Sequence, residues 1–445
     1  MSVSWSFCLD YLAVIALRAR RFSGWRFIPW LHEYLLFPKN DILGRGMFCL
    51  ELDRSDKYYG LLDNRPMAIY ASWHQFCQVA VSLRMCLNLR MRPILAKIDL
   101  GALRGNLESL RKHAGDARIW AIVKADAYGH GLARVQNALR QADGLALLEL
   151  DAAVAARDRG WLKPILLLEG FFGAAEIELF DQHRLATVIH HDEQIGMLES
   201  ARLRAPIEAY LKINTGMNRL GFAVSAVPAA IERLRASGKI STITLMTHYA
   251  DADGERGVAE QALRFQSVVQ SLGLPSSSAN SAALLRHPQT RGDWVRPGIV
   301  LYGCSPFPEE SARSIGARPV MSLTSRIIAV QSVDQGARVG YSGTFIAPRP
   351  MRIGIVACGY ADGYPRHAPD RTPILVDGVR AHTVGRVSMD MLSVDLNEIP
   401  NADVGSAVTL WGDGLSADEV AASAGTVSYE LLCSLAARVP VTVVD

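Results

Sequence analysis

Residues 121–131 read Ala121-Ile122-Val123-Lys124-Ala125-Asp126-Ala127-Tyr128-Gly129-His130-Gly131, a short apolar run that ends in a lysine and precedes two glycines. A lysine at the mouth of a buried strand has a lowered pKa, and a partly neutral amine can form a Schiff base with an aldehyde. The glycines suit a sharp turn. A lone Val-Lys-Ala would more often be an exposed lysine between a strand and a helix. The whole stretch favours a lysine that carries an aldehyde cofactor.

Around this stretch, between about residues 92 and 320, short apolar runs alternate with longer amphipathic segments. This alternation is typical of repeated βα units, in which helices connect parallel strands. Segments 151–159 and 227–235, for example, have helical spacing and charged faces. Eight such units predict an α/β fold, a (β/α)8 TIM barrel. The runs that we expect as its strands are Trp120–Val123, Leu145–Leu150, Pro164–Leu168, Ala186–Ile189, Ala209–Ile213, Ile243–Met246, Ser277–Asn280 and Ile299–Tyr302.

The pattern changes after about residue 320, where helical segments become rare and apolar residues alternate at the period of a strand. Asp-Gly pairs at 362–363, 377–378 and 413–414 are typical of the turns between such strands. We therefore expect a barrel over residues 91–320 and a mostly β C-terminal domain over residues 321–445. The clearest predicted strands of the second domain are Arg326–Val333, Arg352–Ala357, Thr372–Val376 and Ala407–Trp411.

Residues 1–90 differ from the rest of the chain. They hold four of the eight tryptophans and four of the seven cysteines, without sustained strand or helix periodicity. Met91 then opens a segment, Met-Arg-Pro-Ile-Leu-Ala-Lys-Ile-Asp-Leu, that starts like a complete enzyme. We expect residues 1–90 to be an N-terminal extension that is poorly ordered or that reflects a misassigned start. A peripheral membrane or partner-binding segment is the alternative, because Trp25, Phe27 and Trp30 could share one apolar face.

Composition and charge exclude several classes of function. The 445 residues are 49% hydrophobic and 20% charged, with a formal net charge of +3 and no block of five like charges, so no nucleic-acid partner is expected. The apolar stretch 11–17 is far shorter than the roughly 20 residues that span a bilayer. Its flanking charges do not follow the order of a secretory signal. The cysteines lack metal-ligand or disulfide spacing, so we expect no metal, no membrane, and a cytoplasmic location.

Chemically active side chains recur where the predicted barrel strands end. A barrel enzyme places its active site at the carboxyl ends of its strands. Each residue alone has an ordinary explanation, such as a solvated loop charge for Arg219 or a core histidine for His248. Their shared placement indicates an active site. The residues in these positions are Lys124, Arg219, His248, Asn280 and Ser281, and Arg296 opens the predicted eighth strand.

Small polar residues and glycines around the last two strands of such a barrel commonly bind phosphate through hydroxyl and backbone N–H groups. Ser281, Gly298 and Ile299 fit that role. A Schiff-base lysine that faces a phosphate site implies pyridoxal 5′-phosphate (PLP), which has an aldehyde at one end and a phosphate at the other. The sequence therefore predicts PLP as the cofactor.

Residues 92–445 resemble the alanine racemases, PLP enzymes with a (β/α)8 barrel followed by a β domain. The resemblance implies an isomerase that interconverts L-alanine and D-alanine and supplies D-alanine for bacterial cell-wall peptidoglycan. It covers nearly all of the chain after Met91. The matching stretches are AIVKADAYGHG at 121–131, KINTGMNRLG at 212–221, THYADAD at 247–253, ANSAA at 279–283, RPGIVLYG at 296–303, VGYSGTF at 339–345, GYADGYPR at 359–366, VGRVSMDM at 384–391 and TVSYELLC at 426–433.

The resemblance implies a pair of catalytic bases. Lys124 would carry PLP and act on one face of the substrate, and Tyr341 would act on the other. Racemisation needs two groups because a proton removed from one face of the α-carbon must be returned to the opposite face. A free phenol titrates at about pH 10, so Tyr341 needs a polarising partner. The family supplies His248, hydrogen-bonded in turn to Arg296.

The resemblance also assigns the cofactor contacts. Arg296 would face the pyridine nitrogen of PLP, and because a guanidinium keeps its proton the nitrogen would stay unprotonated. That weakens the electron sink and disfavours transamination. The cofactor-binding residues implied are Lys124, Tyr128, Asn280, Ser281, Arg296, Gly298, Ile299 and Tyr429.

Substrate contacts and assembly follow from the same resemblance. Arg219 and the backbone of Met389 would bind the substrate carboxylate, and Tyr360 would narrow the entrance. Lys212 matches a lysine that can be carbamylated and then orients the arginine. Tyr341 and Met389 would reach the site from a partner subunit. The resemblance therefore implies a homodimer whose active sites are shared between chains.

Three alternatives stay open. A broad-specificity racemase acting on serine or other amino acids would share these motifs, because pocket residues decide the substrate. A PLP-binding barrel protein without catalysis is disfavoured by Tyr341, which lies in a second domain that such proteins usually lack. An amino-acid decarboxylase of similar architecture would lack the strong VGYSGTF and RPGIVLYG matches.

Overall fold

The structure is a computed structural model that describes residues 51–52, 58–62, 65–69 and 92–445. The chain divides into two units after Met91. In the first unit, β1 (Glu51–Leu52), β2 (Tyr58–Leu62) and β3 (Arg65–Ile69) pair as an antiparallel sheet. The rest of the prediction for residues 1–90 lies outside the described residues.

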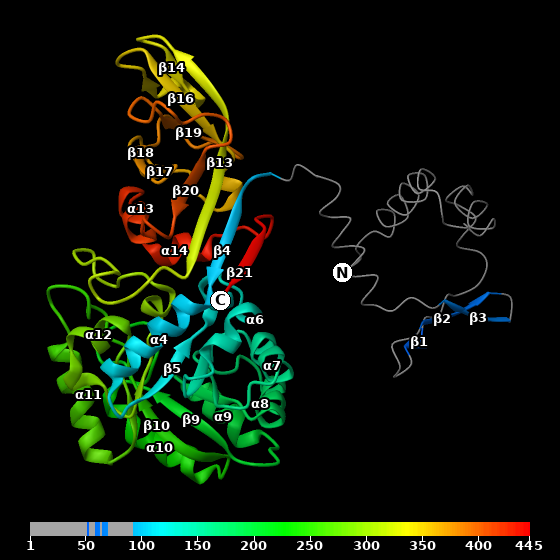
Figure 1. Cartoon of the computed structure of the whole chain (residues 1–445). Helices are drawn as coiled ribbons and strands as arrows, with labels where there is room; N and C mark the ends of the chain where they lie inside the picture. The colour runs from blue at the N-terminus through cyan, green and yellow to red at the C-terminus, as the bar shows by residue number, and fades with distance from the viewer. Residues whose placement is uncertain (1–50, 53–57, 63–64, 70–91) are drawn as a thin grey trace. The chain divides into compact units, whose positions relative to one another are not determined.

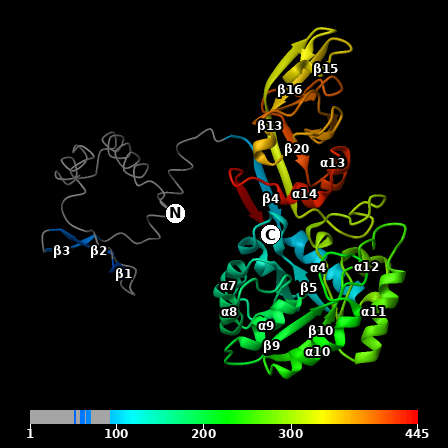
Figure 2. The same cartoon turned by 180° about the vertical axis from the view of Figure 1, so that it is seen from behind.

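The predicted barrel is confirmed. Eight strands, all paired in parallel, close in the order β10-β11-β12-β5-β6-β7-β8-β9. In Figures 1 and 2 this barrel, with helices packed around it, forms one end of the second unit, and the strand-rich domain forms the other end. The strands are β5 (Arg118–Ile122), β6 (Gly144–Leu147), β7 (Ile165–Leu167), β8 (Ala186–Ile189), β9 (Ile207–Lys212), β10 (Ile240–Met246), β11 (Ser276–Ser277) and β12 (Trp294–Val295).

The position predicted for the eighth strand is wrong. Ile299–Tyr302 is a 3-10 helix, η6, and the strand that closes the barrel is β12, which pairs with β5 at Arg118. All of η6 is buried, and Asn106 donates a hydrogen bond to the Leu301 carbonyl at 3.0 Å. A short buried apolar run has the same composition whether it is strand or helix. As a result Arg296 follows the eighth strand and does not precede it.

Aromatic rings fill part of the barrel interior. Trp120 of β5 stacks on Trp294 of β12 with 4.2 Å between ring centroids, and its indole N–H donates to the Tyr210 hydroxyl at 3.2 Å. The first residue of β6, Gly144, has to be a glycine, because a Cβ at this position would lie 2.1 Å from the Trp120 ring. A glycine in a strand commonly marks such a close approach. These rings make the interior a packed core, with the site confined to one end of the barrel.

Helices connect the barrel strands, and both segments that the sequence predicts as helical are confirmed as α7 and α10. Asp99 begins α4 by accepting a hydrogen bond from the Ala102 N–H at 2.7 Å, as an N-cap residue does. The helices of this part of the chain are α4 (Leu100–Ala114), α5 (Lys124–Tyr128), α6 (Leu132–Val135), α7 (Leu150–Asp158), α8 (Ile177–His183), α9 (Asp192–Ser200), α10 (Val227–Ala236), α11 (Ala259–Leu272) and α12 (Ser281–Arg286).

A second sheet forms the mostly β domain, as predicted. Its strands run in the order β18-β17-β20-β13-β16-β19, and β4 pairs with both β13 and β21. The first strand after Met91 therefore belongs to this sheet. The strands are β4 (Leu95–Asp99), β13 (Met321–Val333), β16 (Met351–Val356), β17 (Pro373–Val376), β18 (Val379–His382), β19 (Leu392–Asp395), β20 (Ala407–Trp411) and β21 (Val441–Val444), beside a hairpin of β14 (Arg338–Val339) and β15 (Phe345–Ile346).

Local signals explain parts of this domain. Asp377 and Gly378 connect β17 to β18 with φ of +49° and +79°, the geometry of a two-residue hairpin turn that favours Asp-Gly. Two short helices, α13 (Ala417–Ser423) and α14 (Ser428–Cys433), follow β20, and α14 packs on α5 of the barrel. Among the described residues no helix has the length and apolar character needed to cross a membrane.

Candidate active site

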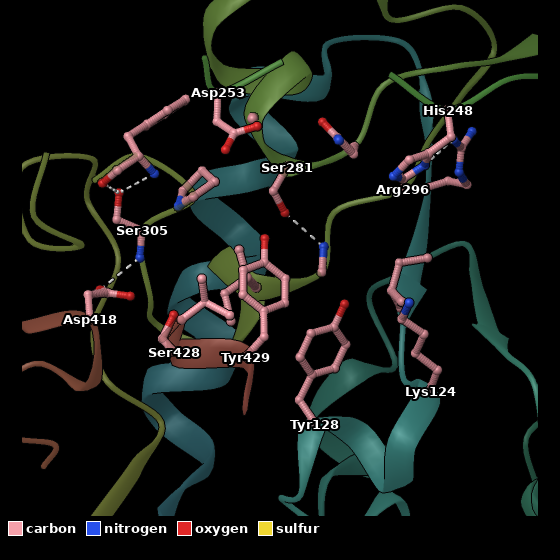
Figure 3. Close-up of a pocket in the computed structure, with 18 of the residues that line it drawn as sticks. Lys124, Tyr128, His248, Asp253, Ser281, Arg296, Ser305, Asp418, Ser428 and Tyr429 are labelled. Atoms are coloured by element: carbon pink, nitrogen blue, oxygen red, sulfur yellow. Dashed lines mark hydrogen bonds between the residues drawn. The ribbon is translucent and has the colours of Figure 1, made fainter. Parts of the chain in front are cut away.

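A cavity of about 870 Å³ lies at the end of the barrel where the strands have their carboxyl termini. Figure 3 shows Lys124, His248 and Arg296 of the barrel on one side of it and Tyr429 and Asp418 of the β domain on the other. The structure thus brings together most of the predicted site residues. Those that line the cavity are Lys124, Tyr128, Lys212, Arg219, His248, Asn280, Ser281, Arg296, Gly298, Ile299 and Tyr429.

Lys124 lies just beyond the end of β5 and is half-buried. Burial lowers the pKa of its amine, the charge of Arg219 lowers it further, and Glu169 acts in the opposite direction. A lowered pKa enlarges the fraction of neutral amine, which is the form that attacks an aldehyde or accepts a proton. Lys124 thus combines partial burial with the lowered pKa that the sequence predicts for an amine at the end of a strand.

The chain turns sharply after Lys124 through a left-handed helical turn. Four consecutive non-glycine residues, Ala125 to Tyr128, have φ between +50° and +56°. L-amino acids lose roughly 1–2 kcal/mol each in this conformation, so it occurs only where the surroundings impose it. Gly129 follows with φ +76°, and a Cβ there would lie 2.1 Å from the Leu432 carbonyl oxygen of α14. The docking of α14 thus requires glycine directly after the turn.

Hydroxyl and backbone groups converge near the start of η6. The Gly298 N–H donates to the Ser281 hydroxyl at 2.8 Å, and a Cβ on Gly298 would lie 2.5 Å from the Tyr128 hydroxyl. Burial raises the pKa of the Tyr128 and Tyr429 phenols, so both stay protonated and can donate. Asn280 uses its side chain to cap α12, accepting from the Ala283 N–H at 2.9 Å. This donor set, with no bulk at Gly298, suits a phosphate group.

Arg296 is buried, with 5% of its surface exposed, and its guanidinium is held on several sides. It donates to the Ser277 hydroxyl at 2.7 Å and to the Thr247 and Ser278 carbonyls at 2.6 and 3.1 Å. Nη2 also lies 3.4 Å from Nδ1 of His248. A guanidinium can only donate, so Nδ1 of His248 is the acceptor and its proton resides on Nε2.

Burial and the surrounding positive charges keep His248 neutral. Burial holds its pKa well below the ordinary value, and the positive charges of Arg296 and Lys212 add to this effect. Burial also lowers the pKa of Arg296, to about 10, which leaves the guanidinium charged near neutral pH. The pair is therefore a fixed cation beside a neutral imidazole that can donate through Nε2.

Lys212 ends β9 and is also buried. Burial, followed by the charges of Arg296 and Arg219, lowers the pKa of its amine to about 8. The loop after β9 carries Arg219, and the Asn214 side chain shapes this loop by accepting from the Gly216 and Asn218 N–H groups at 3.1 and 3.0 Å. The exposed Arg219 guanidinium thus lies at the edge of the cavity, and the buried Lys212 amine that also lines it has a lowered pKa.

Three predicted site residues do not line this cavity: Tyr341, Tyr360 and Met389. They lie on loops of the β domain and expose 70%, 36% and 53% of their surface. These loops touch one another, since the Tyr360 N–H donates to the Ser388 carbonyl at 3.0 Å and Arg386 donates to the Ser342 hydroxyl at 3.3 Å. The three residues thus lie exposed on neighbouring loops of the domain and do not contribute to the cavity of their own chain.

Some cavity residues escape the sequence reasoning. Glu169 follows β7 and could have been found, because it ends a predicted strand as Lys124 and His248 do. Asp253 and Asp418 have no such signal. Asp418 lies on α13 and accepts from the Ser305 N–H at 3.0 Å, and burial raises the pKa of its carboxyl group. No group of three or more His, Cys, Asp and Glu side chains placed to hold a metal occurs among the described residues.

Comparison with known proteins identifies the family. The family model described as "Alanine racemase, N-terminal domain" matches residues 98–306, and the one described as "Alanine racemase, C-terminal domain" matches residues 320–443. The chain is 57% identical to the alanine racemase of Ralstonia nicotianae over 357 residues, which are 79% of this chain and 95% of that protein. It is 54% identical over 351 residues to the catabolic alanine racemase of Klebsiella aerogenes, covering 79% of this chain and 99% of that protein.

A solved structure gives the same result. The biosynthetic alanine racemase of Pseudomonas aeruginosa superposes with a TM-score of 0.78 and 46% sequence identity, over 80% of this chain and 100% of that one. Both family models, relatives that match almost over their full length, and this structural likeness agree. The chain therefore belongs to the alanine racemase family.

Proposed function

We propose that the chain interconverts L-alanine and D-alanine with PLP as cofactor and two bases from different subunits. One observation carries the proposal: a single cavity joins Lys124, whose amine has a lowered pKa, to the hydroxyl and backbone donors around Gly298. These two ends match the aldehyde and the phosphate of PLP. The matched relatives are alanine racemases, which favours alanine as the substrate.

The residues present fit the cofactor. Tyr128, Ser281, Gly298, Ile299 and Tyr429 would hold the phosphate, because neutral hydroxyls and backbone N–H groups are its natural donors and Gly298 leaves room beside Tyr128. Lys124 would bind the aldehyde carbon, and Arg296 would face the ring nitrogen, with Asn280 alongside. Withdrawal of electrons from the α-carbon of the amino acid is the chemistry that PLP supplies when bound.

The chain's own groups would bind the amino acid and move its proton. Arg219, at the cavity edge, would bind the carboxylate through charge-assisted hydrogen bonds. The neutral amine of Lys124 would take the α-proton from one face or return it there. Arg296 cannot lose its proton under these conditions, so it would orient the cofactor and not act as an acid.

The second base would come from another copy of the chain. Tyr341 lies outside the cavity and is 70% exposed, so it is free to enter the site of a neighbouring molecule. We propose a homodimer in which Tyr341 of the partner subunit acts on the opposite face of the α-carbon. Met389 of the partner subunit would add a backbone contact to the carboxylate, and Tyr360 would narrow the entrance.

The tautomer of His248 suits this arrangement. Its Nδ1 accepts from Arg296, so its Nε2–H is the group free to donate. A hydrogen bond from Nε2–H to the oxygen of Tyr341 of the partner subunit would stabilise the phenolate. Lys212, with a pKa of about 8, has enough neutral amine near pH 8 to react with carbon dioxide, and we propose that the resulting carbamate orients Arg219.

The product would serve cell-wall synthesis. We propose that this protein supplies D-alanine for peptidoglycan in the cytoplasm, a reducing compartment that suits the free thiols of Cys304, Cys358 and Cys433 in the described part of the chain. A catabolic role is the second candidate, because the Klebsiella aerogenes relative is named a catabolic enzyme. Growth of a D-alanine auxotroph on this gene alone would support the first role. Failure to restore growth, with an active purified enzyme, would favour the second.

Substrate and chemistry are tested by rates on a panel of L-amino acids with chiral detection of products. We expect alanine to give the highest kcat/KM, and a Lys124→Ala variant to lose racemisation and the borohydride-trapped bond to PLP. Equal or faster turnover of serine would identify a broad-specificity racemase. PLP binding without turnover of any amino acid would identify a binding protein.

Sharing of the site is tested by mixing two defective chains. Co-expressed Lys124→Ala and Tyr341→Phe chains should regain about a quarter of wild-type activity, because half of the dimers are mixed and each mixed dimer has one intact site. Each variant expressed alone is the control. If Tyr341 instead served its own chain, every site would keep one defect and mixing would restore nothing.

A further inference from the structure

His130 lies in the same sequence stretch as Lys124, yet the proposed chemistry gives it no part. It is fully buried, and Nδ1 lies 3.0 Å from the Ala127 carbonyl oxygen and 2.9 Å from the Tyr128 carbonyl oxygen. Both partners can only accept, so Nδ1 carries the proton and donates to both. These carbonyls belong to the left-handed turn, and His130 therefore clamps that turn from its C-terminal side.

The protonation state of this clamp is fixed. Burial lowers the pKa of His130 to about 4, although the two backbone hydrogen bonds act in the opposite direction. Nε2 is buried without a hydrogen-bond partner in the part of the chain that the structure describes. The Tyr302 ring packs against the imidazole, and Asp126 is the charged group that acts on it. The imidazole is thus neutral, with one donor and a defined orientation.

Tyr302 connects the clamp to the strand before Lys124. Its ring packs against those of His130 and Tyr128, with centroid distances of 4.6 and 4.7 Å. Its hydroxyl donates to the Ile122 carbonyl at 2.9 Å, and Ile122 is the last residue of β5. The chain is therefore fixed two residues before Lys124 by Tyr302 and three to four residues after it by His130.

We propose that His130 and Tyr302 form a bracket that positions Lys124, with His130 as the positioning residue that holds the left-handed turn closed. The direction in which the lysine side chain leaves the strand depends on the backbone on both of its sides, and the turn is a conformation that its own sequence disfavours. The inference rests on the proposed role of Lys124. A displacement of about 1 Å in such a group can lower a rate about a hundredfold.

The test compares His130→Ala, which removes the donor, with His130→Asn, whose amide N–H can still reach a backbone carbonyl. His287→Ala is the matched control, because His287 also contacts one backbone carbonyl, that of Ala252 at 3.2 Å, but does not line the cavity. We expect His130→Ala to lower kcat about a hundredfold while KM for alanine changes less than about threefold. The kcat of His130→Asn should be at least tenfold higher than that of His130→Ala, and His287→Ala should have the kcat and KM of the wild type.

A second readout needs no turnover. Apo protein is mixed with PLP, and the bond to Lys124 is trapped with borohydride as a function of pH, while amide hydrogen exchange is followed across residues 125–131. We expect slower trapping in His130→Ala, and at least tenfold faster exchange of the Ala127 and Gly129 amides, which close the turn by donating to Val123 and Ala125. Tyr302→Phe should show the same direction if His130→Ala does not fold.

The outcomes separate the two proposals. Wild-type trapping, exchange and kcat in a folded His130→Ala would overturn the bracket, and so would equal losses in His130→Ala and His130→Asn. If wild-type protein neither traps PLP nor racemises alanine, the proposed function fails, and hydrogen exchange in the apo variants still decides whether His130 holds the turn.

Discussion

Replacing Ala125 by glycine should stabilise the protein, although glycine normally weakens a helix. Ala125 is exposed and has φ +53° and ψ +49°, so its side chain contributes little packing while its backbone is strained. Relief of the left-handed conformation is worth roughly 1–2 kcal/mol. The greater freedom of glycine in the unfolded chain costs about 0.4–1 kcal/mol. The expected net gain in the free energy of unfolding is about 0.5–1 kcal/mol.

The control is Ala229→Gly, an exposed position in the right-handed helix α10, where glycine should cost up to about 1 kcal/mol. Urea unfolding of the full chain compares the two variants with the wild type. Hydrogen exchange at the Gly129 amide, which donates to Ala125, reports the turn locally. The same alanine-to-glycine substitution should thus raise the free energy of unfolding at residue 125 and lower it at residue 229. Destabilisation of Ala125→Gly by as much as Ala229→Gly would refute the strain argument.

Two further predictions concern the cavity. Gly298→Ala should weaken PLP binding to the apo protein at least about tenfold, because the added Cβ would lie 2.5 Å from the Tyr128 hydroxyl. The control Gly173→Ala, where a Cβ would meet nothing within 4 Å, should leave PLP binding unchanged. Absorbance titration measures PLP binding to both variants, and equal binding would exclude the tight fit at Gly298. Burial gives Lys212 a folded-state pKa of about 8, below its unfolded value of 10.5. The buried charge therefore destabilises the fold in full below pH 8, and this cost is relieved as the pH rises toward 10.5. Measured by urea unfolding in buffer free of carbon dioxide, which keeps the Lys212 amine unmodified, the free energy of unfolding of the wild type should rise relative to that of Lys212→Met by up to about 3 kcal/mol over this range, and parallel pH profiles would show that Lys212 titrates normally.

Strong local patterns made most of the barrel predictable. Fully buried runs such as Ala186–Ile189 coincide with their strand, because apolar and β-branched residues dominate strands that are covered on both faces. The prediction of the eighth strand failed for the opposite reason, because β12 is only two residues long and the apolar run nearby packs as a 3-10 helix. The site residues at strand ends could be named before the structure, since barrel geometry alone gathers them.

Other parts of the site depend on tertiary contacts that leave no local trace. Of Ala-Asp-Ala-Tyr only the aspartate tolerates a left-handed turn, and the turn arises here from His130, Tyr302 and the docking of α14. Asp418 enters the cavity from a helix almost 300 residues beyond Lys124, so sequence spacing could not reveal it. These are the places where tertiary packing overrides local preference.

The pairing of β4 with β13 has a mechanical consequence. β4 leads into the barrel and β13 leads out of it, and the two are hydrogen-bonded side by side from Met321 opposite Ile98 onward. The barrel is therefore an insertion between two neighbouring strands of one sheet, and the chain crosses between the domains twice at the same point. A double tether of this kind resists the hinge bending that a single linker would allow. The two crossings thus hold the wall that α14 gives to the cavity against the barrel, and the proposed cofactor site would be assembled before any ligand arrives.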